Sequence, residues 1–174
     1  MVLTRYKKLN ELNKRNRVEL LVSGFGLQKV VEVDDVVNRI LTLPTEHFDK
    51  IKVIKYDPKR QVSFLIRHQR VGRQLGEYLG SFNSIVVYDF KSREECFHVL
   101  MHEIGHHVYF RVLSSQQKKF WVTELYRAEP GVTELGKKNA CEDFAEAYAL
   151  FLNNPESIRD KPLKNGFIAK LFKF

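Results

Sequence analysis

His102-Glu103-Ile104-Gly105-His106 is the stretch from which the rest of the fold can be worked out. Its spacing is H-E-x-x-H, and on an α-helix residues four apart lie on one face, one turn above each other. His102 and His106 can therefore hold one metal ion between them. Glu103 is rotated by about 100° from His102, which places it beside the metal, where a general base belongs. Two histidines leave the site incomplete, because catalytic zinc usually has three protein ligands.

The third ligand is expected on a second helix, at residues 139–152. This helix offers two carboxylates one turn apart, Glu142 and Glu146, which share a face. Ala145 and Ala149 follow a neighbouring line and are small enough for another helix to approach closely. Glu142 can be the third ligand, with Glu146 accepting a hydrogen bond from the second ring nitrogen of a ligand histidine. On the residues alone, the reverse assignment of the two glutamates stays open.

With both motifs in view, the chain resembles the gluzincin metallopeptidases, in which the third zinc ligand is a glutamate on a separate helix. It is most similar to the group that contains the anthrax lethal factor catalytic domain, the Pro-Pro endopeptidases and the minimal gluzincins. The glutamate lies 36 residues after the second histidine. The family pattern N-x-x-E-x-F-A-E-A is matched by Asn139, Glu142, Phe144, Ala145, Glu146 and Ala147.

The resemblance implies particular roles for residues of this chain. It places the third zinc ligand on Glu142. It also implies an edge strand above the site, reading roughly G-x-Y, to which the substrate backbone adds as a further strand. Gly76, Glu77 and Tyr78 match that pattern.

One position departs from the family. Relatives often have a tyrosine seven residues before the ligand glutamate, where its hydroxyl can stabilise the oxyanion. That position is Leu135 here. Tyr126 and Tyr148 are alternative candidates, although neither stands at the family's position.

Other histidines and cysteines near the motifs have simpler interpretations. His98 lies one turn before His102 on the same face, and we expect it to be a core residue or a partner of a ligand, because a fourth protein ligand would close the site. His107 is expected at the surface or as a partner for a helix terminus. Cys96 and Cys141 are too few for a disulfide framework and are expected to be bystanders, although Cys141 adjoins the glutamate motif.

The periodicity predicts both strands and helices, and with the resemblance to gluzincins we expect a zincin-like α+β fold, in which a small twisted, mostly antiparallel sheet packs on the histidine helix and the glutamate helix. A capping box, Ser92 to Glu95, starts the histidine helix, and Ser115 is expected to cap the next helix. Strands are expected at 51–56, 61–68, 75–79 and 85–88. Helices are expected at 4–21, 36–43 (capped by Asp34 or Asp35), 96–113, 116–127 and 139–152.

Composition favours a soluble globular protein. Of its 174 residues, 44% are hydrophobic and 29% charged, which suits one domain with a sizeable core. We expect an N-terminal helical segment at 1–45, a catalytic core at 51–152 and a tail at 155–174. No apolar run approaches the ~20 residues of a membrane span. The first 21 residues do not resemble a secretory signal, so the cytoplasm is the expected location.

The net charge of +8 lies at the two ends of the chain. Residues 1–19 and residues 157–174 contribute +4 each, so the segment between them is neutral. Basic ends can bind nucleic acid or another anionic partner, or only keep the protein in solution. The tail is also apolar, and we expect it to pack over the core as a short helix. The alternative is that it limits access to the cleft, since some minimal gluzincins are latent enzymes blocked by their own C-terminal segment.

These observations predict a zinc-dependent peptidase, most simply an endopeptidase, whose substrate is a polypeptide. His102, His106 and Glu142 would hold Zn²⁺, and Glu103 would act as the general base. One alternative is a catalytically idle zinc protein that docks on nucleic acid or a protein partner through its basic ends. Another is a peptidase recruited to nucleic acid by those ends.

Overall fold

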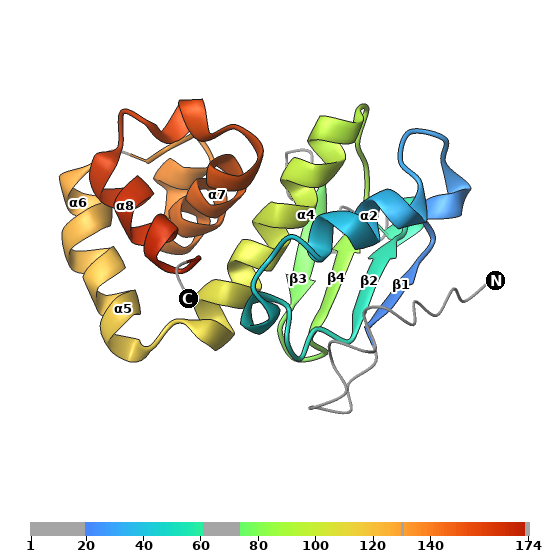
Figure 1. The fold of residues 1–174 in the computed structure, drawn as a ribbon, viewed down its shortest axis with the longest axis horizontal. Coiled ribbons are helices and arrows are strands. Elements are labelled where there is room, and N and C mark those ends of the chain that lie inside the picture. Colours follow the sequence, from blue (N-terminus) through green and yellow to red (C-terminus); the bar gives the residue numbers. More distant parts are fainter. Residues whose placement is uncertain (1–19, 61–73, 130, 173–174) are drawn as a thin grey trace. The chain divides into compact units, whose positions relative to one another are not determined.

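The computed structural model describes residues 20–60, 74–129 and 131–172 (Figure 1). It forms two compact units, residues 1–100 and residues 101–174, and each is described by itself below. The strand expected at 61–68 lies outside the described residues, as does the helix expected at 4–21 apart from its last two positions. The expectation of a single domain stays a prediction.

The first unit contains a mixed four-stranded sheet (Figure 1). Its strand order is β1-β2-β4-β3, and β1–β2 and β2–β4 are parallel pairs whereas β3–β4 is antiparallel. The strands are β1 (Leu21–Ser23), β2 (Val53–Tyr56), β3 (Gly76–Leu79) and β4 (Ser84–Val87). The α+β class is therefore confirmed, but for the described strands the expectation of a mostly antiparallel sheet is wrong, because two of their three pairs are parallel.

The connection between β1 and β2 explains the parallel pairing. It contains the helix α2 (Val33–Ile40), and parallel neighbours need a crossover of this kind, which a hairpin cannot supply. β3 and β4 are instead joined by a tight turn, and they form the antiparallel pair, with Leu79 opposite Ser84. Asn83 in that turn has a φ of 48°, a left-handed conformation that asparagine tolerates better than most residues.

The inner strands of this sheet form much of the core of the first unit. Ile54 of β2 and Ile85 and Val87 of β4 have no exposed surface. In β4 three consecutive residues, from Ile85 to Val87, are buried, and burial without alternation is typical of strands in a sheet covered on both faces. β3 lies at the edge of the described sheet, as the sequence predicted.

α2 begins three residues earlier than predicted. Asp35 occupies the third helical position and not the cap, and its Oδ2 accepts a hydrogen bond from the backbone nitrogen of Glu32 at 3.2 Å. Asp35 also pairs with Arg93 at 2.8 Å, which connects α2 to the start of the histidine helix within the first unit.

The histidine helix, α4 (Arg93–His107), begins at its predicted cap. Ser92 Oγ accepts a hydrogen bond from the backbone nitrogen of Glu95 at 3.1 Å. The helix does not stop at His107 but passes into a π-helical turn, η4 (Val108–Val112). The predicted helix over 96–113 is thus confirmed, with its last turn wound more widely than an α-helix.

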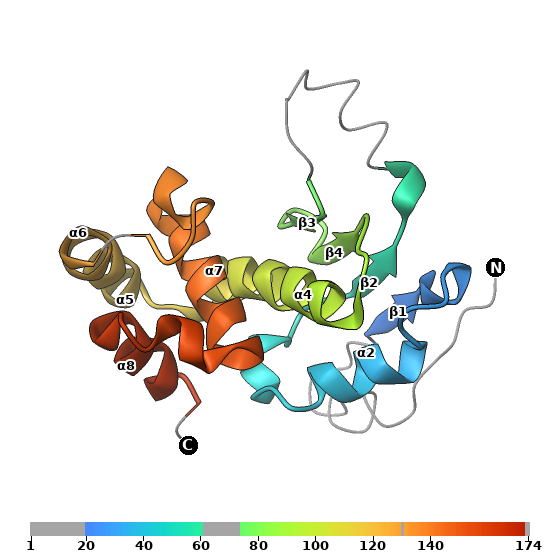
Figure 2. The ribbon, with the colours of Figure 1, turned by 90° about the horizontal axis from the view of Figure 1, so that it is seen from above.

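The second unit continues with helices (Figure 2). Ser114, one residue before the predicted position, caps α5 through a hydrogen bond of 3.2 Å from the backbone nitrogen of Gln117. The remaining elements are α5 (Ser115–Phe120), the π-helical turn η5 (Trp121–Leu125), α6 (Tyr126–Ala128), the 3-10 turn η6 (Gly136–Lys138), α7 (Ala140–Asn153), the 3-10 turn η7 (Pro155–Ile158) and α8 (Pro162–Lys170).

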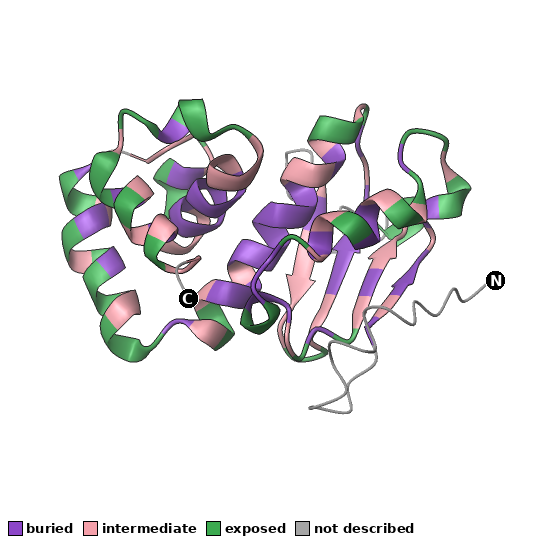
Figure 3. Ribbon diagram, in the orientation of Figure 1, coloured by how far each residue is buried: buried purple, intermediate pink, exposed green. Residues whose placement is uncertain are grey.

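α7 has a buried central stretch. Every residue from Asp143 to Ala149 is buried, which Figure 3 shows as a purple central stretch. Phe144 contacts Trp121 with ring centroids 4.9 Å apart, and Trp121 contacts Phe167 of α8 at 5.3 Å. The tail therefore contributes an aromatic side chain to this core.

Among the described residues, no helix combines the length and the apolar character that crossing a bilayer requires.

Candidate metal centre

The two motif histidines lie on one face of α4 near the start of the second unit. His102 is buried and His106 is half-buried. Their Nε2 atoms are 3.1 Å apart, and their rings are nearly perpendicular, at 88°. The spacing of four residues has thus brought two imidazole nitrogens to one point, as the sequence predicted.

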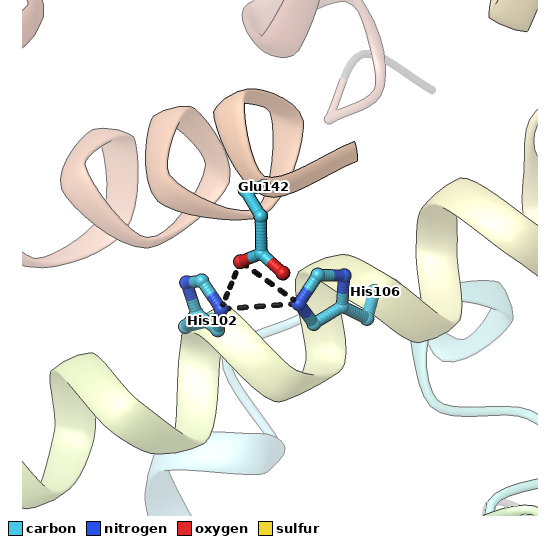
Figure 4. A group of neighbouring side chains, drawn as sticks. All are labelled: His102, His106 and Glu142. Atoms are coloured by element: carbon cyan, nitrogen blue, oxygen red, sulfur yellow. Dashed lines mark hydrogen bonds and ion pairs between the residues drawn. The ribbon is translucent and has the colours of Figure 1, made fainter. Parts of the chain in front are cut away.

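Glu142 reaches the same point from α7 (Figure 4). Its Oε2 lies 3.3 Å from His102 Nε2 and 3.5 Å from His106 Nε2. His102, His106 and Glu142 form the one group of potential metal ligands found within the described residues.

Two local features bring α7 to this position. The side chain of Asn139 caps the helix, because its Oδ1 accepts hydrogen bonds of 3.0 Å from the backbone nitrogens of both Cys141 and Glu142. Farther along, α7 lies directly against α4: a Cβ added to Gly105 would be only 2.9 Å from the Cα of Ala145. The expected close approach at Ala145 is therefore present, with Gly105 as its partner.

The separations of the three ligand atoms fit a small tetrahedral cation. Ligand atoms bound to such an ion at ~2.0–2.1 Å are about 3.3 Å apart, close to the 3.1, 3.3 and 3.5 Å found here. Two imidazole nitrogens with one carboxylate oxygen suit a transition metal such as zinc or iron(II), whereas calcium and magnesium prefer oxygen ligands alone.

Glu146 contacts the other side of His102. Its Oε1 lies 2.7 Å from His102 Nδ1. A carboxylate is thus placed to accept the Nδ1–H hydrogen bond, which directs Nε2 toward the convergence point as the nitrogen that would bind a metal. The two glutamates thus occupy different positions, Glu142 at the convergence point and Glu146 behind a ligand. This is the arrangement expected from the family resemblance.

His106 has a partner that the sequence interpretation did not anticipate. Its Nδ1 lies 3.3 Å from the sulfur of Cys141, the residue immediately before Glu142. The sequence predicts a bystander at Cys141 because two cysteines are too few for a disulfide framework. The one sign in the sequence that Cys141 belongs to the site was its position directly before Glu142.

The site attracts positive charge. Burial lowers the pKa of His102, but the carboxylates of Glu142 and Glu146, together with the charge of Glu103, outweigh this and raise the pKa to about 10. Burial alone would raise the pKa of Glu142. The imidazoles of His102 and His106 lower it by more than burial raises it, so the pKa of Glu142 lies well below its usual value. Three acidic side chains therefore stabilise a cation at this point.

Glu103 is buried on α4. Its charge contributes to the raised pKa of His102, so it lies close enough to act electrostatically on the cluster. Burial, followed by the charges of Glu142 and Glu103, also raises the pKa of Cys141 to about 12. The thiol is therefore un-ionised at neutral pH.

The remaining residues to which the sequence analysis gave a role lie on α4 and in β3. His98 is half-buried on α4 within the first unit. Gly76, Glu77 and Tyr78 are in the edge strand β3, where Glu77 accepts a hydrogen bond of 2.6 Å from the hydroxyl of Tyr88. The surface position offered for His107 is wrong, because the residue has no exposed area. It is the last residue of α4, directly before η4.

The oxyanion partner is not assigned by the geometry. Leu135 lies in the turn before η6. The hydroxyl of Tyr126 donates to the backbone oxygen of Lys137 at 2.8 Å. Tyr148 is fully buried, and its ring contacts those of Phe144 and Phe172.

Two comparisons with known proteins gave no match. No protein-family model matches this chain, and no curated protein is significantly similar to it.

Proposed function

We propose that this protein is a zinc-dependent peptidase of the gluzincin type, acting as an endopeptidase on a polypeptide. The observation that carries the proposal is the convergence of His102, His106 and Glu142 at separations that fit a tetrahedral ion. Three protein ligands with a further position for water or substrate are the usual composition of a catalytic zinc site, whereas structural sites have four protein ligands.

Within this proposal each side chain has a separate task. A bound zinc ion supplies Lewis acidity, lowering the pKa of water and polarising a carbonyl group. The carboxylate of Glu103 takes a proton from the attacking water and gives it to the leaving amine. Glu146 keeps the His102 proton on Nδ1 and so keeps Nε2 free to bind the metal.

The resemblance to gluzincins also assigns a substrate contact. Gly76, Glu77 and Tyr78 form an edge strand, and an edge offers backbone groups with which an extended peptide can pair. A structure with bound peptide should show main-chain hydrogen bonds to the segment around Glu77. A peptide held only by side chains elsewhere would exclude this role.

The test combines metal content with turnover of a peptide library. Purified protein should contain about one zinc per chain, and Glu142→Ala should lose most of it. Glu103→Gln should keep the metal and lose about 10²- to 10⁴-fold in rate, the usual contribution of a general base. Glu134→Gln is the matched control, because Glu134 is exposed in the same unit, and it should change neither quantity.

The results separate the alternatives. Full zinc content without hydrolysis of any library peptide would favour a catalytically idle zinc protein. Salt-sensitive binding of DNA together with turnover would favour a peptidase recruited through its basic ends. Protein that contains no zinc and gains none on incubation would overturn the proposal.

A further inference from the structure

The two ligand histidines have chemically different partners. His102 Nδ1 faces a carboxylate oxygen of Glu146 at 2.7 Å, whereas His106 Nδ1 faces the sulfur of Cys141 at 3.3 Å. Metal-binding histidines almost always donate their second ring N–H to a carboxylate, a backbone carbonyl or a water. A thiol sulfur is a much weaker acceptor, so the partner of His106 is unusual.

We infer that Cys141 is a positioning residue for His106: its sulfur accepts the Nδ1–H hydrogen bond and so keeps Nε2 of the ring directed at the metal. The inference rests on the proposed zinc centre. It gives Cys141 a task in metal binding that does not require it to be a ligand or a nucleophile.

The surroundings of the ring show why an edge contact matters. Phe110 lies over one face of the His106 ring, with centroids 6.5 Å apart and planes at 23°. A stacked neighbour limits tilting of a ring but leaves it free to rotate within its own plane. Contacts at the ring edge, Cys141 at Nδ1 and Glu142 at Nε2, restrict that rotation.

The backbone holds Cys141 and Glu142 as one unit. Both of their backbone nitrogens donate to Oδ1 of Asn139 at 3.0 Å, which fixes the first turn of α7. This one turn therefore presents the metal ligand Glu142 and the partner of the metal ligand His106 side by side. A change in the Cys141 side chain should act on His106 without moving Glu142.

The experiment compares Cys141→Ala with Cys141→Ser in the full chain. Alanine removes the acceptor and should weaken zinc binding about 10- to 100-fold, the usual cost of losing such a partner. Serine keeps an acceptor at nearly the same place and should restore most of the affinity. Cys96→Ala removes the other thiol, which lies in the first unit, and should leave zinc affinity unchanged.

Affinity is measured by competition with a chelator, and the ring is observed by long-range ¹H–¹⁵N NMR of the zinc-loaded protein. The wild type and Cys141→Ser should show His106 protonated at Nδ1 with slow exchange, and Cys141→Ala should show fast exchange or a mixture of tautomers. A general loss of packing would not be rescued by serine in this way.

The outcomes are distinguishable. Wild-type zinc affinity together with a slowly exchanging Nδ1 proton in Cys141→Ala would overturn the inference and leave the zinc centre intact. Equal weakening by alanine and serine, with an unchanged His106 spectrum in both, would also overturn it. A wild-type protein that binds no zinc would overturn the proposed function itself.

Discussion

Glu142 and Glu146 have the same functional group one helical turn apart, yet their surroundings give them different chemistry. Glu142 faces two Nε2 atoms from the start of α7, where its side chain is partly exposed. Glu146 is almost fully buried and meets one Nδ1 atom. Glu146 contacts the Nδ1 side of His102 and is not part of the group of potential ligand atoms. Substitutions at the two glutamates should therefore have different effects on metal binding.

Substitutions at Glu146 should weaken zinc binding without abolishing it. Glu146→Gln keeps an oxygen acceptor for His102 Nδ1 but removes the charge, and we expect a loss of up to about tenfold in affinity; Glu146→Ala should lose about 10- to 100-fold. Chelator competition measures both, with the Tm of the metal-free protein as a check on folding. Full affinity in Glu142→Ala together with loss of zinc in Glu146→Ala would reverse the two roles.

At the scale of elements, the site depends on how closely α4 and α7 approach each other. A Cβ at Gly105 would lie 2.9 Å from Ala145 Cα and 3.2 Å from Ala145 O, both backbone atoms that a rotamer change cannot move. The absence of a side chain at Gly105 therefore sets the separation of the helices, and through it the distance of Glu142 from the histidines.

Gly105→Ala should accordingly push the helices apart and weaken zinc binding. Overpacking costs about 1–3 kcal/mol, partly offset by up to about 1 kcal/mol of helix propensity. Gly166→Ala is the matched control in α8, because its added Cβ would meet nothing within 4 Å, and it should stabilise by up to about 1 kcal/mol. Thermal unfolding and zinc competition measure both variants, and wild-type zinc affinity in Gly105→Ala would contradict this account.

The same elements show what a single sequence can reveal. α4 and α7 are long and carry residues at helical spacing, so their existence and the shared face of Glu142 and Glu146 were predictable. The spacing alone left open which of the two glutamates meets the histidines. β1 has only three residues, too few for any periodicity, and without it the parallel crossover was missed. The π-helical turn η4 (Val108–Val112) has no sequence signature, so the widening of the helix after His107 was not predictable. The contact between Cys141 and His106 joins two helices and cannot be read from either one.

At the scale of the whole second unit, the C-terminal tail is part of the core. The buried carboxylate of Glu129 holds the first turn of α8. It accepts hydrogen bonds of 2.9 and 3.1 Å from the backbone nitrogens of Leu163 and Lys164. Lys164 Nζ then pairs with Asp143 at 2.8 Å, and both side chains have no exposed area. Asp143 directly follows Glu142, so this ion pair connects the tail to the start of the glutamate helix.

Lys164→Met should therefore destabilise the protein and weaken zinc binding together. Removing one member of a buried ion pair costs about 3–5 kcal/mol, and burial already raises the pKa of Asp143 despite its partner, so the unpaired carboxyl would take up a proton. Lys161→Met is the control: its partner Asp160 is largely exposed, and such pairs contribute about 0–1 kcal/mol. Thermal unfolding, zinc content and peptidase rate are measured for both. A tail that acts as a removable latch would instead give Lys164→Met an unchanged Tm and a higher rate of peptide hydrolysis.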